Sequence, residues 1–352
     1  MRTHWKRSLL ALAAALVAAA VTAGFALARP AAKRAASPTA GVVVIDTTLG
    51  YEGSQAAGTG MVLTSSGEVL TNNHVIEGAT KITVRVPQTG RSYAATVLGY
   101  SVSADTALLQ LKDASGLTTV ATGSSSSLKR GQAVRAVGNA GGTGRLTLVR
   151  GAITGLGKAI TASDGQGQSE RLTGLVETNA NVRPGDSGGP LLDASGRVVG
   201  MDTAASATGG FTFQQAAADA YAIPIAKALA VAKQVEAHHA SATVHIGGTA
   251  FLGIQVSSPG RGYGYGYGYG YGSDTPAGAL VAGVVSGSPA DLAGLAYGDE
   301  ITGIDGKAVS SADGLVGLLL QHHPGDKVTL RVLDPYGGSA TVTVRLASGP
   351  AQ

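Results

Sequence analysis

The sequence predicts a chain in two parts, an all-β first domain built as an antiparallel barrel or sandwich and a smaller α+β module after it. From residue 42 onward, short runs rich in Val, Ala, Leu and Thr are separated by Gly, Ser, Asn or Asp. Glycine reaches 53 of the 352 residues. Both observations are typical of short strands joined by tight turns. The length fits two domains once a targeting segment is set aside.

The first domain is expected at residues 41–237, and its strands are expected where an apolar run lies between turn-forming clusters. These runs cover residues 42–47, 60–64, 81–86, 93–98, 107–111, 133–137, 146–154, 172–178 and 198–203. A helix over residues 225–237 closes the domain, because Pro224 fits the first turn of a helix.

The second module is expected at residues 249–348, after a linker over residues 238–248. Its elements are strands at 250–256, 279–285, 299–304, 326–333 and 339–346 and helices at 288–293 and 310–322. Between its first two strands, Tyr and Gly alternate over residues 260–272. This insert cannot pack a core, because every second residue has no side chain. We interpret it either as a flexible hairpin extension or as a surface of Tyr side chains that binds glycan, cell wall or another copy of the same tract.

The charge of the chain is concentrated at its N-terminus. Residues 1–40 hold six of the 26 basic residues and none of the 22 acidic ones, which leaves 20 basic against 22 acidic residues elsewhere. The folded part is therefore not basic, and nothing predicts a nucleic acid partner. The chain contains no cysteine, which excludes disulfides, Cys-ligated metal sites and thiol chemistry. No pattern predicts a cofactor or a metal ion.

The first 28 residues form a targeting segment. Three basic residues precede an apolar run over residues 8–28, which is close to the ~20 residues that span a bilayer. Residues 26–28, Ala-Leu-Ala, fit a signal-peptide cleavage site. The segment predicts either a cleaved signal peptide or a membrane anchor, followed by a flexible linker over residues 29–40. Both interpretations place the rest of the chain outside the cytoplasm.

The strongest chemical pattern lies at residues 183–191, Arg-Pro-Gly-Asp-Ser-Gly-Gly-Pro-Leu. Peptide hydrolysis by a serine needs an exposed hydroxyl and backbone N–H groups aimed at the developing oxyanion. Glycines on both sides of Ser187 permit backbone conformations closed to other residues. In this geometry the N–H groups of Gly185 and Ser187 form the oxyanion hole. An ordinary Gly-Ser turn is the alternative, so the partners of the serine decide between the two.

A nucleophilic serine needs a base, and the base needs a carboxylate that orients it. Among seven histidines, His74 follows a Gly-rich strand and begins a short turn in Leu-Thr-Asn-Asn-His-Val-Ile. Asp105 immediately precedes the apolar strand at 107–111, which would bury it against His74. Asp113 follows that strand and is expected to point away. The sequence thus predicts a triad of His74, Asp105 and Ser187.

These motifs, in this order, resemble the trypsin-like fold and specifically the HtrA (Deg) family. That family shows a Gly-x-Gly strand before Thr-Asn-x-His-Val, then Asp-x-Ala-x-Leu, the serine loop, Ala-Ile-Pro before a helix, and a PDZ domain. The resemblance covers about residues 41–348. It implies an all-β two-barrel trypsin-like protease domain with the triad between two six-stranded barrels, followed by a small α+β PDZ domain. It also implies acylation of Ser187, with His74 as base and then acid and Asp105 orienting it.

Two positions depart from the family pattern. Asp186 stands where the family more often has Asn, and we expect it either to pair with an Arg such as Arg183 or to stay solvated. Asp219 and Tyr221 fall in the stretch that lines the primary specificity pocket, where the family usually has an aliphatic residue. Asp219 predicts a preference for a basic or polar residue before the cut, unless its side chain turns to solvent.

The resemblance also implies a peptide site in the C-terminal module. Successive N–H groups of Leu252, Gly253 and Ile254 would bind a C-terminal carboxylate, and the peptide would add as a strand beside the helix at 310–322. His322 and His323 at the end of that helix allow a metal interpretation. Cationic side chains that suit the helix dipole are the simpler explanation.

The sequence predicts an extracytoplasmic serine endopeptidase, membrane-anchored or secreted, that hydrolyses unfolded or damaged proteins. Its expected partners are unfolded polypeptides, peptide C-termini and, as the family implies, copies of itself in a trimer or larger assembly. A catalytically silent adaptor or chaperone is the main alternative, and the presence of all three triad residues disfavours it. A wall-binding protein that uses the Tyr-Gly tract is a third interpretation.

Overall fold

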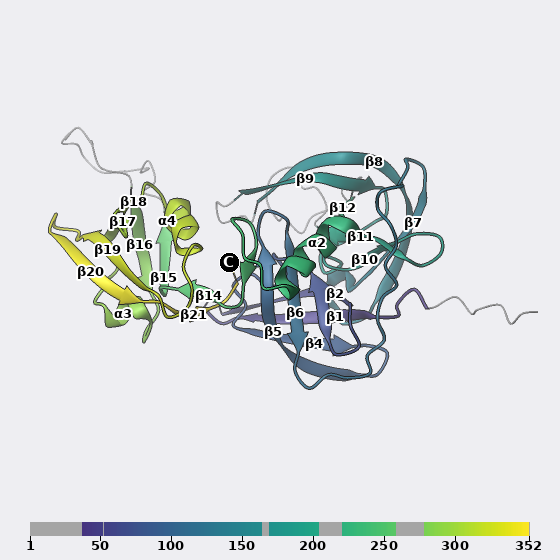
Figure 1. Cartoon of the computed structure of the whole chain (residues 1–352), viewed down its shortest axis with the longest axis horizontal. Coiled ribbons are helices and arrows are strands. Elements are labelled where there is room, and N and C mark those ends of the chain that lie inside the picture. Colours follow the sequence, from purple (N-terminus) through teal and green to yellow (C-terminus); the bar gives the residue numbers. More distant parts are fainter. Residues whose placement is uncertain (1–36, 52, 164–168, 204–219, 258–277, 352) are drawn as a thin grey trace, which may run out of the picture. The chain divides into compact units, whose positions relative to one another are not determined.

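The structure is a computed structural model that describes residues 37–351, except residues 52, 164–168, 204–219 and 258–277 (Figure 1). The predicted targeting segment and the Tyr-Gly insert lie outside the described residues. Within the described part of the chain, no helix has the length and apolar character needed to cross a membrane.

The first six strands close into a barrel. They are β1 (Val42–Leu49), β2 (Ser54–Val62), β3 (Glu68–Thr71), β4 (Lys81–Val86), β5 (Arg91–Ser101) and β6 (Thr106–Leu111). They pair in the order β5-β4-β1-β2-β3-β6, and a further β5–β6 pairing closes the ring. In β4 every second residue is buried, because alternate side chains of a strand point to opposite faces. Those side chains join an apolar core that includes Val43, Ile45 and Leu109.

The next six strands form a second closed barrel, with the order β10-β11-β12-β9-β8-β7. They are β7 (Ala133–Gly138), β8 (Thr147–Ser163), β9 (Ser169–Thr178), β10 (Pro190–Leu192), β11 (Val198–Thr203) and β12 (Ala220–Pro224). A short 3-10 turn, η1 (Ala140–Gly142), follows β7. Figure 1 shows β8 and β9 as a long teal pair. The two barrels confirm the all-β architecture predicted for the first domain.

Helix α2 (Ile225–Glu236) follows β12 and packs one apolar stripe against both barrels. The buried residues of the stripe recur every three or four positions, as on one face of a helix; they are Ile225, Ala228, Val231, Ala232 and Val235. They share a core cluster with Val42 and Leu108 of the first barrel and Val198 of the second. The helix therefore ties the barrels together over an apolar core.

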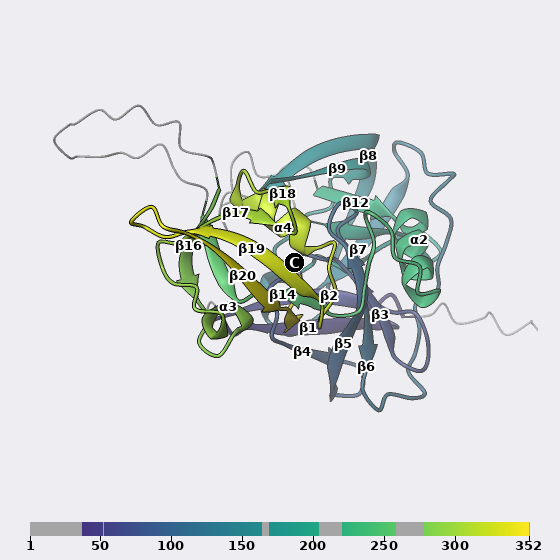
Figure 2. The same cartoon turned by 60° about the vertical axis from the view of Figure 1, so that its left-hand side comes forward.

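The C-terminal module is the expected small α+β unit, with β15, β16, β17, β19 and β20 in one sheet and the pair β14–β21 beside it. Its strands are β14 (Thr249–Phe251), β15 (Ile254–Ser257), β16 (Ala279–Val284), β17 (Glu300–Ile304), β18 (Lys307–Ala308), β19 (Lys327–Leu333), β20 (Ser339–Arg345) and β21 (Ala347–Gly349). Helices α3 (Pro289–Leu292) and α4 (Ala312–Leu319) begin at Ser288 and Ser311, whose hydroxyls accept N–H groups of the first turn. Figure 2 shows β19 and β20 side by side.

Several short elements escaped the sequence prediction, among them β3, β10, β12 and β13. β3, β10 and β12 have three to five residues each, too few for an alternating pattern to stand out. β13 (His245–Ile246) lies in the expected linker and pairs with β5. Helix α4 ends at Leu319, earlier than expected. His322 lies beyond the helix, with Nε2 3.5 Å from Asp305 Oδ2 and Nδ1 3.8 Å from Asp326 Oδ2.

Candidate active site

His74 stands on the turn that follows β3. The N–H groups of Ile76 and Glu77 both bond to the carbonyl of Asn73, which forms a tight turn around the histidine. Thr71, the last residue of β3, pairs with Ala107 of β6. Because β6 begins just after Asp105, this register brings the ends of the two strands, and hence His74 and Asp105, to the same edge of the first barrel.

Asp105 and His74 are in direct contact, as the sequence predicted. His74 Nδ1 lies 3.0 Å from both carboxylate oxygens of Asp105, and the backbone N–H of His74 donates to Oδ1 at 3.1 Å. Thr203 Oγ1 donates to Oδ2 at 2.7 Å. A carboxylate can only accept, so the imidazole carries its proton on Nδ1, and a base made in this way takes its next proton at Nε2. Asp113, the competing carboxyl, lies in an exposed turn after β6.

The loop that carries Ser187 needs its glycines. Gly185 and Gly188 have φ of +94° and +84°, a region that side chains with a Cβ rarely adopt. A Cβ on Gly185 would lie 2.3 Å from the carbonyl oxygen of Asn139, and one on Gly188 would lie 2.1 Å from that of Thr59. The glycines thus let the loop pack directly on backbone from η1 and β2.

The N–H groups of this loop alternate between bonded and open. Asp186 N donates to the carbonyl of Arg183 at 2.9 Å, which closes a turn. Within the described residues, the N–H groups of Gly185 and Ser187 on either side have no hydrogen-bond acceptor. Two open donors flanking one engaged donor form the arrangement expected of an oxyanion hole.

Two short connections join Ser187 to the His74–Asp105 pair. The carbonyl of Ser187 accepts the N–H of Thr59 at 2.9 Å, which attaches the loop to β2 of the first barrel. Gly188 N donates to the carbonyl of Asp202 at 2.8 Å, and the next residue, Thr203, holds Asp105. The Ser187 loop is therefore linked by hydrogen bonds to β2 of the first barrel and, through Asp202 and Thr203, to the residue that holds Asp105.

Two buried carboxyl groups lie behind the serine. Asp186 is 2% exposed, and its Oδ2 accepts the backbone N–H of Arg183 at 2.9 Å. Burial raises the pKa of Asp186 to about 6, against the smaller lowering effects of that hydrogen bond and the Arg183 charge. The expectation that Asp186 stays solvated was wrong, because its loop folds inward onto β7, where it meets Gly138.

Asp202 is fully buried on β11. Within the described residues, neither of its carboxyl oxygens has a hydrogen-bond partner, and Oδ1 of Asp186 also has none. Burial raises the pKa of Asp202 well above its ordinary value, and the charge of Asp186 raises it further. Burial therefore favours the neutral form of Asp202.

The residues predicted for the specificity pocket are only partly described. Asp219 lies outside the described residues. Tyr221 is on β12, half-buried, and its hydroxyl donates to Glu177 Oε1 at 3.3 Å. Lys158 Nζ lies 3.1 Å from the same oxygen. Because Tyr221 pairs with Thr203 across β11 and β12, it stands next to the residue that holds Asp105.

The predicted carboxylate loop of the C-terminal module borders a groove. Leu252, Gly253 and Ile254 line it from one side, and Leu315, Val316, Leu319 and Leu320 line it from the α4 side. Gly253 has a φ of +86°, and its carbonyl accepts Val285 N at 2.9 Å. Within the described residues, the N–H groups of Leu252 and Gly253 have no acceptor.

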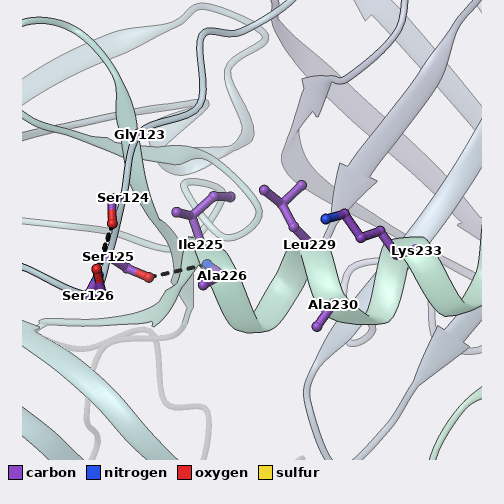
Figure 3. Close-up of a pocket in the computed structure, with 9 residues that line it drawn as sticks. All are labelled: Gly123, Ser124, Ser125, Ser126, Ile225, Ala226, Leu229, Ala230 and Lys233. Carbon is purple, nitrogen blue, oxygen red and sulfur yellow. Dashed lines mark hydrogen bonds between the residues drawn. The ribbon is translucent and has the colours of Figure 1, made fainter.

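A second cavity lies away from these sites, between a run of serines and the start of α2 (Figure 3). Ser125 Oγ accepts the N–H of Ala226 at 3.2 Å, and Ser124 and Ser126 bond to each other at 2.8 Å. The hydroxyl of Ser125 thereby satisfies an N–H of the first helical turn, which Pro224 has no side-chain oxygen to do. None of the predicted site residues lines this cavity. We assign Ser125 in its wall to capping the start of α2.

Sequence reasoning missed three residues of the site, Thr59, Thr203 and Asp202. Thr203 and Asp202 end a predicted strand, and Thr59 stands between Gly58 and Gly60, just before the strand predicted at 60–64. A polar residue in a buried strand must find a partner, but the sequence does not say which residue that partner is.

Comparisons with known proteins agree with this geometry. Residues 58–201 match the trypsin-like peptidase domain family, and residues 250–346 match the PDZ domain family. The chain thus combines a trypsin-like peptidase domain with a PDZ domain. It is 31% identical to the serine protease PepD of Mycobacterium tuberculosis over 87% of this chain and 63% of that one.

It is also 33% identical to the periplasmic pH-dependent serine endoprotease DegQ of Escherichia coli, over 79% of this chain and 57% of that one. The solved structure of the HtrA-type protease AlgW with a tripeptide is 28% identical and covers 89% of this chain and 95% of its own, with a TM-score of 0.48. The chain belongs to the HtrA family of trypsin-like serine proteases with a C-terminal PDZ domain. It spans about 60% of the length of these two curated relatives.

Proposed function

We propose that this chain is an extracytoplasmic serine endopeptidase that hydrolyses peptide bonds of unfolded or damaged proteins. The observation that carries the proposal is the His74–Asp105 contact, set beside a serine loop whose N–H groups at Gly185 and Ser187 are open. This combination supplies the base, its orienting carboxylate, the nucleophile and the oxyanion donors that acyl transfer requires.

The chemistry follows from the proton positions. Nε2 of His74 takes the proton of Ser187 Oγ as the oxygen bonds to the scissile carbonyl carbon, and the carbonyl becomes an oxyanion. The imidazolium then gives its proton to the leaving amine as the C–N bond breaks, which leaves an acyl-serine. Water, deprotonated by His74, then bonds to the acyl carbon; the bond from that carbon to Ser187 Oγ breaks, and His74 returns the proton to Oγ. Asp105 holds Nδ1–H throughout, while the N–H groups of Gly185 and Ser187 stabilise each oxyanion.

The PDZ groove supplies a second contact with substrate. We propose that the N–H groups of Leu252, Gly253 and Ile254 bind the C-terminal carboxylate of a peptide. The peptide would extend along β15, opposite the apolar side chains of α4. The open N–H groups of Leu252 and Gly253, together with the Leu-rich wall at 315–320, support an apolar C-terminal residue.

Cleavage preference is proposed to depend on Asp219 and Tyr221. An acidic side chain in the primary pocket favours a basic or polar residue before the cut. Tyr221 is held by Glu177, which also pairs with Lys158, so this wall of the pocket is fixed in place by hydrogen bonds. Mapping the cut sites in a denatured protein tests this preference directly.

We propose residues 1–28 as a signal peptide or membrane anchor, 29–40 as a linker, 41–237 as the protease domain and 249–348 as the PDZ domain. The DegQ relative is a periplasmic protease, which supports a location outside the cytoplasm. Assembly into a homo-oligomer such as a trimer is proposed from the family alone.

The proposal is tested by Ser187→Ala. The variant removes one oxygen, so we expect it to keep the fold and lose casein cleavage by ~10⁴-fold or more. Ser195→Ala is the matched control, because Ser195 is an exposed serine in the β10–β11 turn whose hydroxyl bonds to Asp193 and Arg197 of the same turn. It should cleave casein at the wild-type rate. Unchanged cleavage by Ser187→Ala would end the proposal.

A further inference from the structure

Thr59 is a buried hydroxyl in contact with the serine loop. It lies on β2 of the first barrel and is 0% exposed. Its hydroxyl donates to the carbonyl of Gly185 at 2.7 Å and accepts the N–H of Asn139 at 2.9 Å. One side chain of the first barrel therefore satisfies two buried backbone groups of the second.

The hydroxyl bond fixes one particular peptide plane. The peptide between Gly185 and Asp186 is held at its carbonyl by Thr59 Oγ1 and at its N–H by the carbonyl of Arg183, 2.9 Å away. With both ends engaged, this peptide cannot rotate without breaking two hydrogen bonds. The N–H groups of Gly185 and Ser187 lie on either side of it, and their direction depends on this plane.

The rest of Thr59 supports the same loop. Its N–H donates to the carbonyl of Ser187 at 2.9 Å, and its carbonyl accepts the hydroxyl of Thr71 at 2.7 Å. Asn139 continues the support, because its Oδ1 accepts Gly144 N at 2.6 Å and braces the loop that follows β7. Gly141 N also donates to the carbonyl of Pro184 at 2.7 Å.

We propose that Thr59 is a positioning residue that sets the oxyanion donors through its hydroxyl relay from Asn139 N–H to Gly185 C=O. The inference rests on the proposed function of Ser187. Thr59 touches no substrate. It acts by keeping the Gly185–Asp186 peptide in the one orientation that leaves both flanking N–H groups available to the oxyanion.

Thr59→Val tests the relay, because valine keeps the shape of threonine but replaces the hydroxyl with a methyl group. We expect kcat to fall about 10²-fold, as misplaced catalytic groups do, with KM unchanged within about threefold. A peptide boronic acid, whose adduct with serine resembles the tetrahedral intermediate, should bind more weakly by a factor similar to the loss in kcat. Thr59→Ser restores the hydroxyl and should recover most of the activity.

The matched control is Thr178→Val. Thr178 is also 0% exposed, and its hydroxyl also donates to a carbonyl, of Ala152 at 3.0 Å, and accepts an N–H, of Ala180 at 3.1 Å. The control therefore loses the same two bonds away from the serine loop. We expect a similar fall in Tm for both valine variants, with kcat and boronate affinity lost only in Thr59→Val.

Several outcomes would overturn the inference while leaving the proposed function intact. All of them assume an active wild type. They are equal kcat losses in Thr59→Val and Thr178→Val, no recovery of activity in Thr59→Ser, or a boronate affinity that does not fall together with kcat. If Thr59→Val does not fold, Thr59→Cys replaces it, because a thiol is a weak donor. An inactive wild type would instead contradict the proposed function.

Discussion

The two barrels surround their buried aspartates in opposite ways. Asp105, from the first barrel, receives hydrogen bonds from the backbone and ring of His74 and from the hydroxyl of Thr203. Asp186 and Asp202, from the second barrel, are equally buried but have three carboxyl oxygens with no partner among the described residues. The residue type and the burial are the same in both places. The two sites differ in how many hydrogen bonds the carboxyl groups accept.

The number of hydrogen bonds to a buried carboxyl group shows which of these aspartates can orient a catalytic histidine. A buried carboxyl group that accepts several hydrogen bonds is held in one position and can orient an imidazole ring, as the proposed role of Asp105 requires. A buried carboxyl without donors avoids the cost of burying a charge by keeping its proton. The contribution of Asp186 to stability therefore depends on pH.

The largest effect is expected from Asp105→Asn. The amide keeps the shape of the carboxyl group but cannot hold the imidazolium, and it favours the wrong tautomer of His74. We expect kcat to fall by ~10⁴-fold, with KM nearly unchanged. Steady-state kinetics on a peptide substrate measure both. A loss below about tenfold would mean that Asp105 does not orient His74.

A smaller effect, on stability, is expected from Asp186→Asn. The pKa of Asp186 is raised from 3.8 to about 6, so between these values the native state binds more protons than the unfolded chain. The free energy of unfolding then falls as pH rises through this window. The variant should escape this loss and gain on the order of 3 kcal/mol relative to wild type between pH 4 and 7.

Urea unfolding at several pH values measures this gain, and Asp193→Asn is the control of opposite sign. Burial acts to raise the pKa of Asp193, but hydrogen bonds from Ser195 and Arg197 outweigh burial and lower it. Asp193 therefore stabilises the native state above its unfolded pKa. The variant lacks this gain, so it should become less stable than wild type as pH rises from acid. Parallel pH curves for wild type and Asp186→Asn would show that the Asp186 carboxyl is not buried with a raised pKa.

The smallest effect is expected from Thr203→Val. This change removes one of the hydrogen bonds to Asp105 and leaves both bonds from His74. A hydrogen bond to a charged group contributes about 1.5 kcal/mol, which corresponds to about tenfold in kcat. Thr106→Val removes a neighbouring buried hydroxyl that bonds to the carbonyl of Ala104 instead. If both variants lose equal activity, Thr203 has no special role in holding Asp105.

The sequence points to the candidate catalytic residues more clearly than to the residues that hold them in position. His74, Asp105 and Ser187 stand in motifs whose spacing and glycines have a chemical reason, so they could be found without coordinates. Thr59 and Thr203 could not, because their roles arise only when β2 and β11 meet residues far along the chain. A hydroxyl on a strand gives no local sign of the partner it will find.

The fold shows the same division. A strand with a clear alternating pattern, such as β4, was predicted at its observed bounds, Lys81–Val86. Short strands such as β10 were missed because three residues of Pro-Leu-Leu carry no period. The burial of Asp186 was left open between two expectations, since only tertiary packing against Gly138 decides whether an aspartate beside glycines faces water.

The measurement closest to the central claim is covalent labelling of the full chain with a fluorophosphonate, followed by mass-spectrometric mapping of the adduct. The reagent reacts with a serine only when a base activates it and an oxyanion hole stabilises the product. We predict a single adduct on Ser187 in the wild type and none in His74→Ala. A folded wild type without an adduct on Ser187, or equal labelling after loss of His74, would contradict the account.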